Sequence, residues 1–154
     1  MNSMSTANEP LLWKIRTFIY DHFAETTQPP NVEETANQFS IDVSQTYSIY
    51  KRLHEHHAII LEPNSFSIRM ANPFSGIPTD FKVLAKGKTY YATCAWDMLG
   101  IPSALQVDAA IEAVCTDTRD LIHLDVRNGQ ISLSQAKINF PLPFSRWYED
   151  LIFT

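Results

Sequence analysis

The residues best suited to chemistry lie in one short stretch, residues 90–102. It contains Cys94 and, three residues later, Asp97. Thr93 is a typical N-cap residue, so we expect a helix to begin there with Cys94 in its first turn. The free N–H groups and the positive end of the helix dipole in that turn favour thiolate over thiol. The three-residue spacing places the Asp97 carboxyl on the same helix face, so the pair could bind a soft metal through sulfur and move a proton to a leaving group.

Simpler explanations exist for Cys94 and for the other residues whose types could do chemistry. A lone cysteine in an aromatic-rich segment is more often a small buried hydrophobe, and spacing alone leaves that alternative open for Cys94. The cluster His54-Glu55-His56-His57 lacks the metalloprotease spacing, because Ala58 stands where the second zinc-binding histidine would be. We interpret this cluster as a solvated helix end.

Two units are expected to position these residues, and the first is helical. Residues 1–10 carry no pattern and are predicted to be a disordered arm. In residues 11–71, apolar residues at helical spacing predict a first helix that ends before Pro29-Pro30. Two further helices and a two-stranded ribbon complete a winged-helix layout. The first helix is predicted to begin at Leu11. Asn31, with Glu34 in a capping box, is the predicted N-cap of the second helix, and Asp42 or Ser44 that of the third.

The second unit, residues 72–154, is predicted to be mostly antiparallel β structure with one inset helix. Residues 72–78 form the linker to it, and Gly100 and Pro102 are expected to stop the inset helix near residue 99. Asn128-Gly129 is the strongest hairpin signal. The predicted strands are 81–85, 88–93, 107–114, 121–126 and 130–138. The fold class is therefore α+β, with a three-helix winged-helix-like unit packed on the β unit.

Composition excludes several classes of protein. The chain has 154 residues, of which 45% are hydrophobic, and a net charge of −5. It is therefore not intrinsically disordered, and no apolar stretch is long enough to span a membrane. Cys94 and Cys115 are too few for a disulfide framework, which predicts a reducing, cytoplasmic location. The acidity makes a nucleic-acid partner unexpected.

The stretch Cys-Ala-Trp-Asp, followed by Leu-Gly-Ile-Pro and preceded by Lys-Thr-Tyr-Tyr-Ala-Thr, resembles the active-site segment of alkylmercury (organomercurial) lyases. The resemblance covers most of the chain from about Leu11. It implies protonolysis of a carbon–mercury bond to a hydrocarbon and Hg(II), a reaction of mercury detoxification. By position, Cys94 would be the thiolate that takes the mercury, and Asp97, also at the metal, would handle the proton for the departing carbon. Cys115 matches a family cysteine regarded as structural and buried.

The resemblance also implies partners. The substrates would be small organomercurials, and no cofactor is expected. Hg(II) would remain on sulfur until a low-molecular-weight thiol or a mercury-reducing enzyme accepts it. A second essential cysteine of the family follows a segment that resembles residues 147–154, and the sequence stops at about that point. Two interpretations stay open, a C-terminally shortened form of a longer lyase or a natural homologue with altered activity.

Two other functions compete with the lyase. The first is a winged-helix DNA-binding regulator, with residues 42–57 as its recognition helix. Residues 1–70 contain five basic and eight acidic side chains, a net charge of −3, which disfavours DNA binding. The second is a homologue that binds mercury through Cys94 without turnover.

Overall fold

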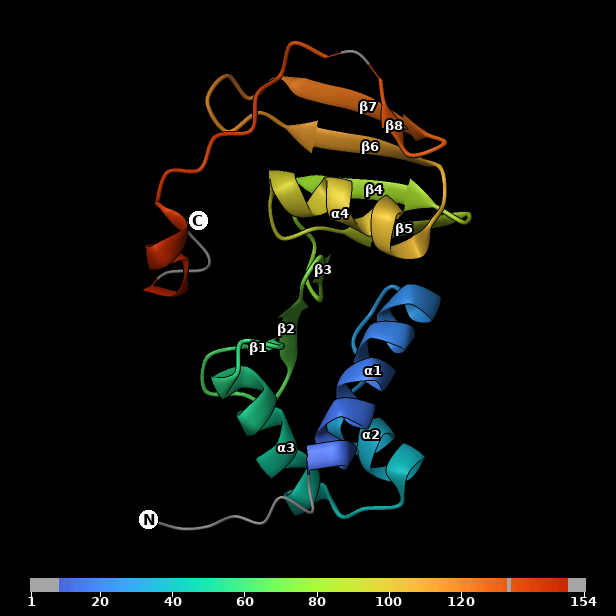
Figure 1. Ribbon diagram of the computed structural model, residues 1–154, viewed down its shortest axis with the longest axis vertical. Helices are drawn as coiled ribbons and strands as arrows, with labels where there is room; N and C mark the ends of the chain where they lie inside the picture. Colours follow the sequence, from blue (N-terminus) through green and yellow to red (C-terminus); the bar gives the residue numbers. More distant parts are fainter. Residues whose placement is uncertain (1–8, 133, 150–154) are drawn as a thin grey trace.

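Three helices, α1 (Glu9–Thr26), α2 (Val32–Phe39) and α3 (Val43–Glu55), form one end of the molecule (Figure 1). The computed structural model describes residues 9–132 and 134–149. Helix α1 begins two residues earlier than predicted, so Glu9 and Pro10 are helical, and the rest of the predicted arm lies outside the described residues. Proline is tolerated in a first helical turn because no intrahelical partner is available there for its missing N–H. The buried residues of α1 confirm the predicted apolar face: Leu12, Ile15, Ile19 and Phe23.

The predicted caps of the next two helices are confirmed. The Glu34 amide donates to Asn31 Oδ1 at 2.8 Å, and the Asn31 amide donates to Glu34 Oε2 at 2.7 Å, which completes the capping box. Of the two candidates for α3, Asp42 is the cap, since its Oδ1 accepts from the Gln45 amide at 2.6 Å. These local contacts orient α2 and α3 before any long-range packing forms.

A small antiparallel sheet follows the helices, made of β1 (Ile60–Leu61), β2 (Ile68–Ala71) and β3 (Phe74–Ser75) in that order. The first two strands confirm the predicted ribbon. The third strand shows that the prediction of residues 72–78 as a plain linker was wrong. Phe74 is buried and stacks on Phe23 of α1 with ring centroids 5.5 Å apart, so this segment is held by packing on both sides. The relation of this unit to winged-helix domains stays a prediction.

The second sheet has five antiparallel strands in the order β5-β4-β6-β7-β8. Its strands are β4 (Phe81–Ala85), β5 (Lys88–Tyr91), β6 (Ala109–Val114), β7 (Leu121–Arg127) and β8 (Gln130–Ile131). Asn128 and Gly129 have φ angles of 51° and 73°, as the predicted two-residue hairpin turn requires. Strand β8 is much shorter than the predicted 130–138. The described residues that follow it are mostly exposed, so a longer strand would bury little apolar surface.

Helix α4 (Ala95–Leu105) is the inset helix, and it runs past the predicted stop. Pro102 lies inside it, although a proline removes one helical hydrogen bond. Ile101 and Pro102 are both buried, and this burial offsets the lost bond. Gly100 faces Pro73 so closely that an added Cβ would lie 3.1 Å from the proline ring. The prediction failed because it considered only the local propensity of Gly100 and Pro102.

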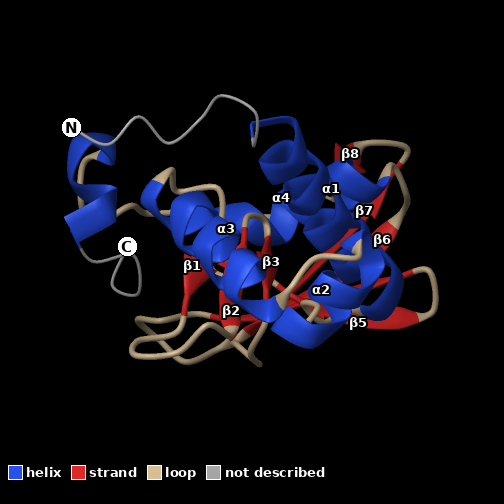
Figure 2. Cartoon of the chain, turned by 90° about the horizontal axis from the view of Figure 1, so that it is seen from below, coloured by secondary structure: helices blue, strands red, loops and turns tan. Residues whose placement is uncertain are grey.

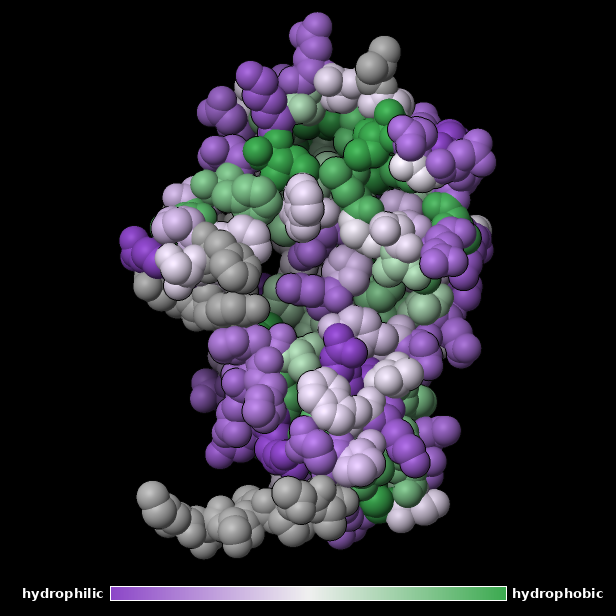
Figure 3. Space-filling view, in the orientation of Figure 1, coloured by the Kyte–Doolittle hydropathy of each residue, from purple (hydrophilic) through white to green (hydrophobic). Residues whose placement is uncertain are grey.

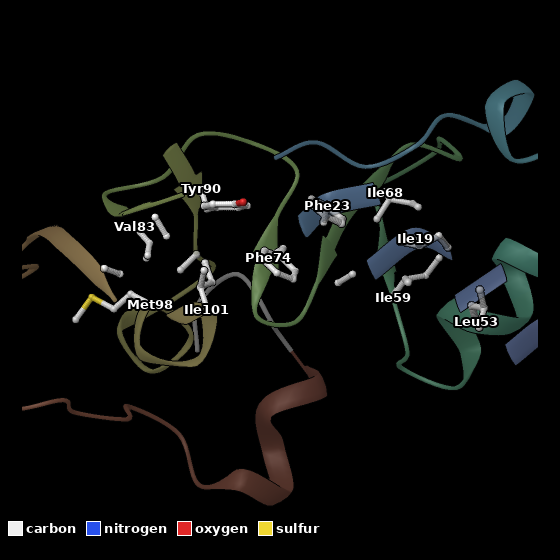
Figure 4. Packing of buried hydrophobic residues seen from close by; sticks show 14 of the residues in the cluster. Ile19, Phe23, Leu53, Ile59, Ile68, Phe74, Val83, Tyr90, Met98 and Ile101 are labelled. Carbon is white, nitrogen blue, oxygen red and sulfur yellow. The ribbon is translucent and has the colours of Figure 1, made fainter. Parts of the chain in front are cut away.

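Figure 2 views the chain from the helical end, with α1, α2 and α3 in front of the strands of the second sheet. One continuous hydrophobic cluster joins this end to the five-stranded sheet (Figure 4). In Figure 4, Phe74 lies between Phe23 on the helical side and Tyr90 on the sheet side. The Tyr90 hydroxyl donates to the Ala24 carbonyl at 2.7 Å, which ties β5 directly to α1. The α+β class and the packing of helices on a β unit are thus confirmed. The division into domains at residues 11–71 and 72–154 stays a prediction.

Tyr50 makes the fold sensitive to alkaline pH. Its side chain is fully buried, its hydroxyl lies 2.7 Å from that of Thr35, and burial raises its pKa to about 12. Because the pKa is raised in the folded state, the stabilisation is complete below pH 10 and is lost as the pH rises towards 12. The free energy of unfolding should fall by about 2 kcal/mol over this interval through Tyr50. In urea titrations at pH 9 and 12, the free energy of unfolding of Tyr50→Phe should decrease less than that of the parent protein, by the part that Tyr50 contributes. Tyr47→Phe on the same helix is the control, and an equal decrease in both variants would contradict the assignment.

Candidate active site

Cys94 stands at the boundary between β5 and α4. Its backbone is extended, with φ −149° and ψ 177°, and its carbonyl accepts the first helical bond from the Met98 amide at 3.1 Å. Cys94 is therefore the N-cap itself, and the prediction of Thr93 as N-cap was wrong by one residue. The physical reason is that the Thr93 hydroxyl has another partner, the carboxyl of Asp97. The sulfur still lies beside the first free amides of the helix.

The structure brings Cys94 and Asp97 together, as their spacing predicts. Asp97 is in the first turn of α4, and its Oδ2 accepts from the Thr93 hydroxyl at 2.5 Å. The Cys94 thiol lies near the same carboxyl group, close enough for the charge of Asp97 to affect the pKa of the thiol. All three side chains are half-buried. A hydrogen-bonded hydroxyl and carboxyl and a nearby thiol thus lie together at the start of α4.

The electrostatics of the sulfur differ from the prediction. Burial is the largest effect and raises the pKa of Cys94, and the negative charge of Asp97 raises it further. The backbone N–H groups of Trp96 and Asp97 lower the pKa, as expected at a helix start, but they do not outweigh burial and the carboxylate. The helix start thus favours thiolate as predicted, but the net pKa of Cys94 is raised, which the prediction did not include. The resting group is a thiol beside a carboxyl that can accept its proton.

Asp97 is shifted in a direction that suits proton transfer. Burial raises its pKa, while hydrogen bonds from the Thr93 hydroxyl and the Cys94 thiol lower it by smaller amounts. A carboxyl with a raised pKa holds a proton closer to neutral pH than an exposed aspartate does. Asp97 can therefore accept a proton from the thiol and deliver it nearby.

A small half-open pocket with a cavity volume of about 60 Å³ lies beside the pair. Its lining comes from three separate parts of the chain: Met70, Asn72, Thr93, Cys94, Trp96, Asp97, Phe140 and Trp147. In Figure 1, α4 begins on the side that faces the C-terminal 3-10 helix η2 (Phe144–Glu149). The space-filling view shows the surface hollowed between the C-terminal segment and the body of the molecule (Figure 3).

Sequence reasoning missed five of the eight residues of this lining. It placed Thr93, Cys94 and Asp97 together, but it assigned no role to the other pocket residues. The Trp96 side chain could have been recognised from its position two residues after Cys94. No local signal brings residues 70, 72, 140 and 147 to the same place, because each is separated from Cys94 by more than twenty residues of sequence.

Cys115 has a different environment. It lies in the turn after β6 and is half-buried, not buried as the resemblance implies. The Thr118 hydroxyl, followed by the Thr118 and Asp117 amides, lowers its pKa. It is not among the described residues that line the pocket. Within residues 9–132 and 134–149, no group of three or more histidine, cysteine or acidic side chains is arranged to hold a metal ion. Cys94 and Asp97 are thus the candidate ligands for a soft metal.

Known proteins resemble the chain in the region of this pocket. The model of the alkylmercury lyase family, MerB, matches residues 74–150, which is half of the chain. No curated protein matches the sequence. A solved structure described as the mercury-bound form of MerB2 is 28% identical, with a TM-score of 0.62, over 85% of this chain and 61% of that chain. The chain therefore spans about three-fifths of the length of MerB2. Residues 147–154 resemble the segment that precedes the second essential cysteine of the family. Residues 150–154 of this segment lie outside the described residues.

Proposed function

Because the chain belongs to the alkylmercury lyase family, we propose that it cleaves carbon–mercury bonds of organomercurials by protonolysis. The products are a hydrocarbon and Hg(II), and the process is mercury detoxification. The observation that carries the proposal is that Cys94 and Asp97 line the same pocket, with the carboxyl near enough to the thiol to influence its pKa. The likeness to a mercury-bound protein supports mercury as the substrate's metal.

In the proposed reaction, the substrate arrives as an organomercury cation bound to an external thiolate. Cys94 gives its proton to Asp97, and the Cys94 sulfur donates an electron pair to mercury. The bond between sulfur and mercury places more electron density on the carbon, which becomes basic enough to be protonated. Asp97 then delivers the proton to that carbon as the carbon–mercury bond breaks. The hydrocarbon leaves, and Hg(II) remains shared between Cys94 and the external thiolate, so protons and charge balance.

The shifted pKa values fit these two roles. A thiol with a raised pKa needs a base, and Asp97 lies near enough to influence its pKa. Once mercury replaces the proton on sulfur, Asp97 holds that proton near the developing negative charge on carbon. Its raised pKa makes it a better proton acceptor than an exposed aspartate, and the proton that it accepts can pass on to the carbon. No further protein residue is needed to explain the path of the proton.

We also propose how the product leaves. Hg(II) on a single protein thiolate is open to attack by a second thiol, so a low-molecular-weight thiol or a mercury-reducing enzyme would accept it. Such thiols are abundant in a reducing cytoplasm, and we propose that location. Among the described residues, no helix is both long enough and apolar enough to cross a membrane. No resident cofactor enters the proposed reaction.

The direct test of the proposed function mixes the protein with phenylmercury and an excess of a small thiol. Headspace gas chromatography then measures benzene, with a protein-free sample as the blank. The proposal predicts benzene in catalytic excess over protein. Formation of a protein–mercury adduct without benzene would instead establish a mercury-binding homologue. Sequence-selective DNA binding in a low-salt band-shift would revive the regulator, although no observation of the structure favours it.

Thr93 offers a separate prediction because it orients Asp97. Thr93→Val keeps the shape of the side chain but removes the hydroxyl that donates to Asp97. Since that hydrogen bond lowers the pKa of Asp97, the pKa should rise in the variant, and the pH profile of benzene release should shift upwards. Thr93→Ser, which keeps the hydroxyl, should retain the parent profile. Identical profiles for the valine and parent proteins would mean that Thr93 has no influence on the reacting carboxyl.

A further inference from the structure

Three aromatic side chains form a continuous wall beside Cys94. The ring centroids of Trp96 and Phe140 are 6.2 Å apart, and those of Phe140 and Trp147 are 5.0 Å apart with nearly parallel planes. All three residues line the pocket that contains the sulfur. We call Trp96, Phe140 and Trp147 the aromatic wall.

The wall is preformed and open towards the pocket. The Trp147 indole donates to the Leu142 carbonyl at 3.0 Å, which fixes the ring that η2 contributes to the wall. Trp96 is 58% exposed and Phe140 is 39% exposed, although both rings are large and apolar. Exposed aromatic surface of this kind, gathered at a pocket with few polar groups, is typical of a site that receives an apolar ligand.

The position of the wall relative to the sulfur suggests which part of the substrate it meets. Trp96 lies two residues after Cys94 in the first turn of α4. Mercury bonded to the Cys94 sulfur therefore carries its organic group within a pocket whose apolar side is this wall. Met70 and Asn72 complete the lining from β2 and the residues after it, and a methionine side chain adapts readily to an apolar group.

Taking the proposed function as its basis, we infer that the aromatic wall binds the organic group of the substrate and gives the protein a preference for arylmercury over methylmercury. A flat aryl ring can stack on or meet the edge of the wall rings, and each such pair adds to the stabilisation from apolar burial. A methyl group offers no ring and much less apolar area. The preference resides in kcat/KM, because the wall holds the group that must stay beside Asp97 while it is protonated.

The experiment compares kcat/KM for phenylmercury and methylmercury, measured as benzene and methane release. In Trp96→Ala the value for phenylmercury should fall about tenfold, and that for methylmercury by no more than about twofold. Trp96→Phe should keep most of the preference, and Phe140→Leu should lose part of it. Trp13→Ala, which removes an exposed tryptophan of α1 outside this pocket, is the matched control and should keep the parent ratio.

The unfavourable results are equally specific. An unchanged ratio in Trp96→Ala would overturn the inference. An equal loss on both substrates would also overturn it, because Trp96 would then support the fold or Cys94 rather than select the organic group. Circular dichroism and the melting temperature of each variant show whether a loss reflects unfolding.

A binding measurement separates this inference from the proposed function. In a Cys115→Ser background, the protein is mixed with equal amounts of phenylmercury and methylmercury and a small competing thiol. Intact mass spectrometry then reports which organomercury group occupies Cys94, and headspace gas chromatography reports which hydrocarbon, if any, has been released. A phenyl preference that Trp96→Ala abolishes supports the wall even where no hydrocarbon is released, a result that would defeat only the lyase proposal. Equal occupancy by the two mercurials would overturn the wall, whether or not they are cleaved.

Discussion

Replacing Cys94 with alanine should lower benzene release from phenylmercury to the rate of the protein-free blank, a loss of at least about a thousandfold. The reason is that the sulfur provides the bond to mercury that makes the departing carbon basic. Asp97 remains in Cys94→Ala, but without that bond it faces a carbon that is too weakly basic to accept its proton. Benzene release under excess thiol is the measurement.

Cys115→Ser is the matched control for the loss of a thiol. Cys115 is half-buried in the turn after β6 and does not belong to the described lining of the pocket, so its replacement should leave benzene release unchanged. If Cys94→Ala released benzene as fast as the parent protein, the lyase proposal would be wrong. If Cys115→Ser were the inactive variant, the assignment of the reacting sulfur would be wrong instead.

Replacing Asp97 with asparagine should separate mercury binding from bond cleavage. The amide keeps the size of the carboxyl but cannot carry its proton, so phenylmercury should still occupy Cys94 while benzene release slows by about 10² to 10⁴. Intact mass spectrometry measures occupancy, and single-turnover gas chromatography measures release. An unchanged rate of release would exclude Asp97 as the proton carrier.

The same variant has a second readout in the thiol. The negative charge of Asp97 raises the pKa of Cys94, so Asp97→Asn should lower that pKa. The pH dependence of alkylation by iodoacetamide, measured in a Cys115→Ser background, should therefore shift to lower pH. A merely structural role for Asp97 predicts loss of folding or of mercurial occupancy without this shift. Circular dichroism distinguishes a folded variant from an unfolded one.

Short-range sequence patterns predict much of this protein, because their causes are local. The capping box at Asn31 and Glu34, the cap at Asp42 and the turn at Asn128-Gly129 depend on residues within four positions of each other. The proximity of Cys94 and Asp97 belongs to the same class, since one helical turn brings them together whatever surrounds it. The α+β class follows from the same periodicities.

Contacts between distant segments decide the rest. Pro102 stays helical and Phe74 becomes a strand residue because burial against other elements outweighs local propensity. The thiol form of Cys94 results from burial, which the dipole of a helix start cannot reveal. Phe140 and Trp147 can join Trp96 in the aromatic wall only because the chain returns to α4 after it has formed the whole sheet. Spacing thus predicts which groups could react, whereas packing sets their pKa values and the shape of the space around them, since desolvation and apolar contact depend on every atom nearby.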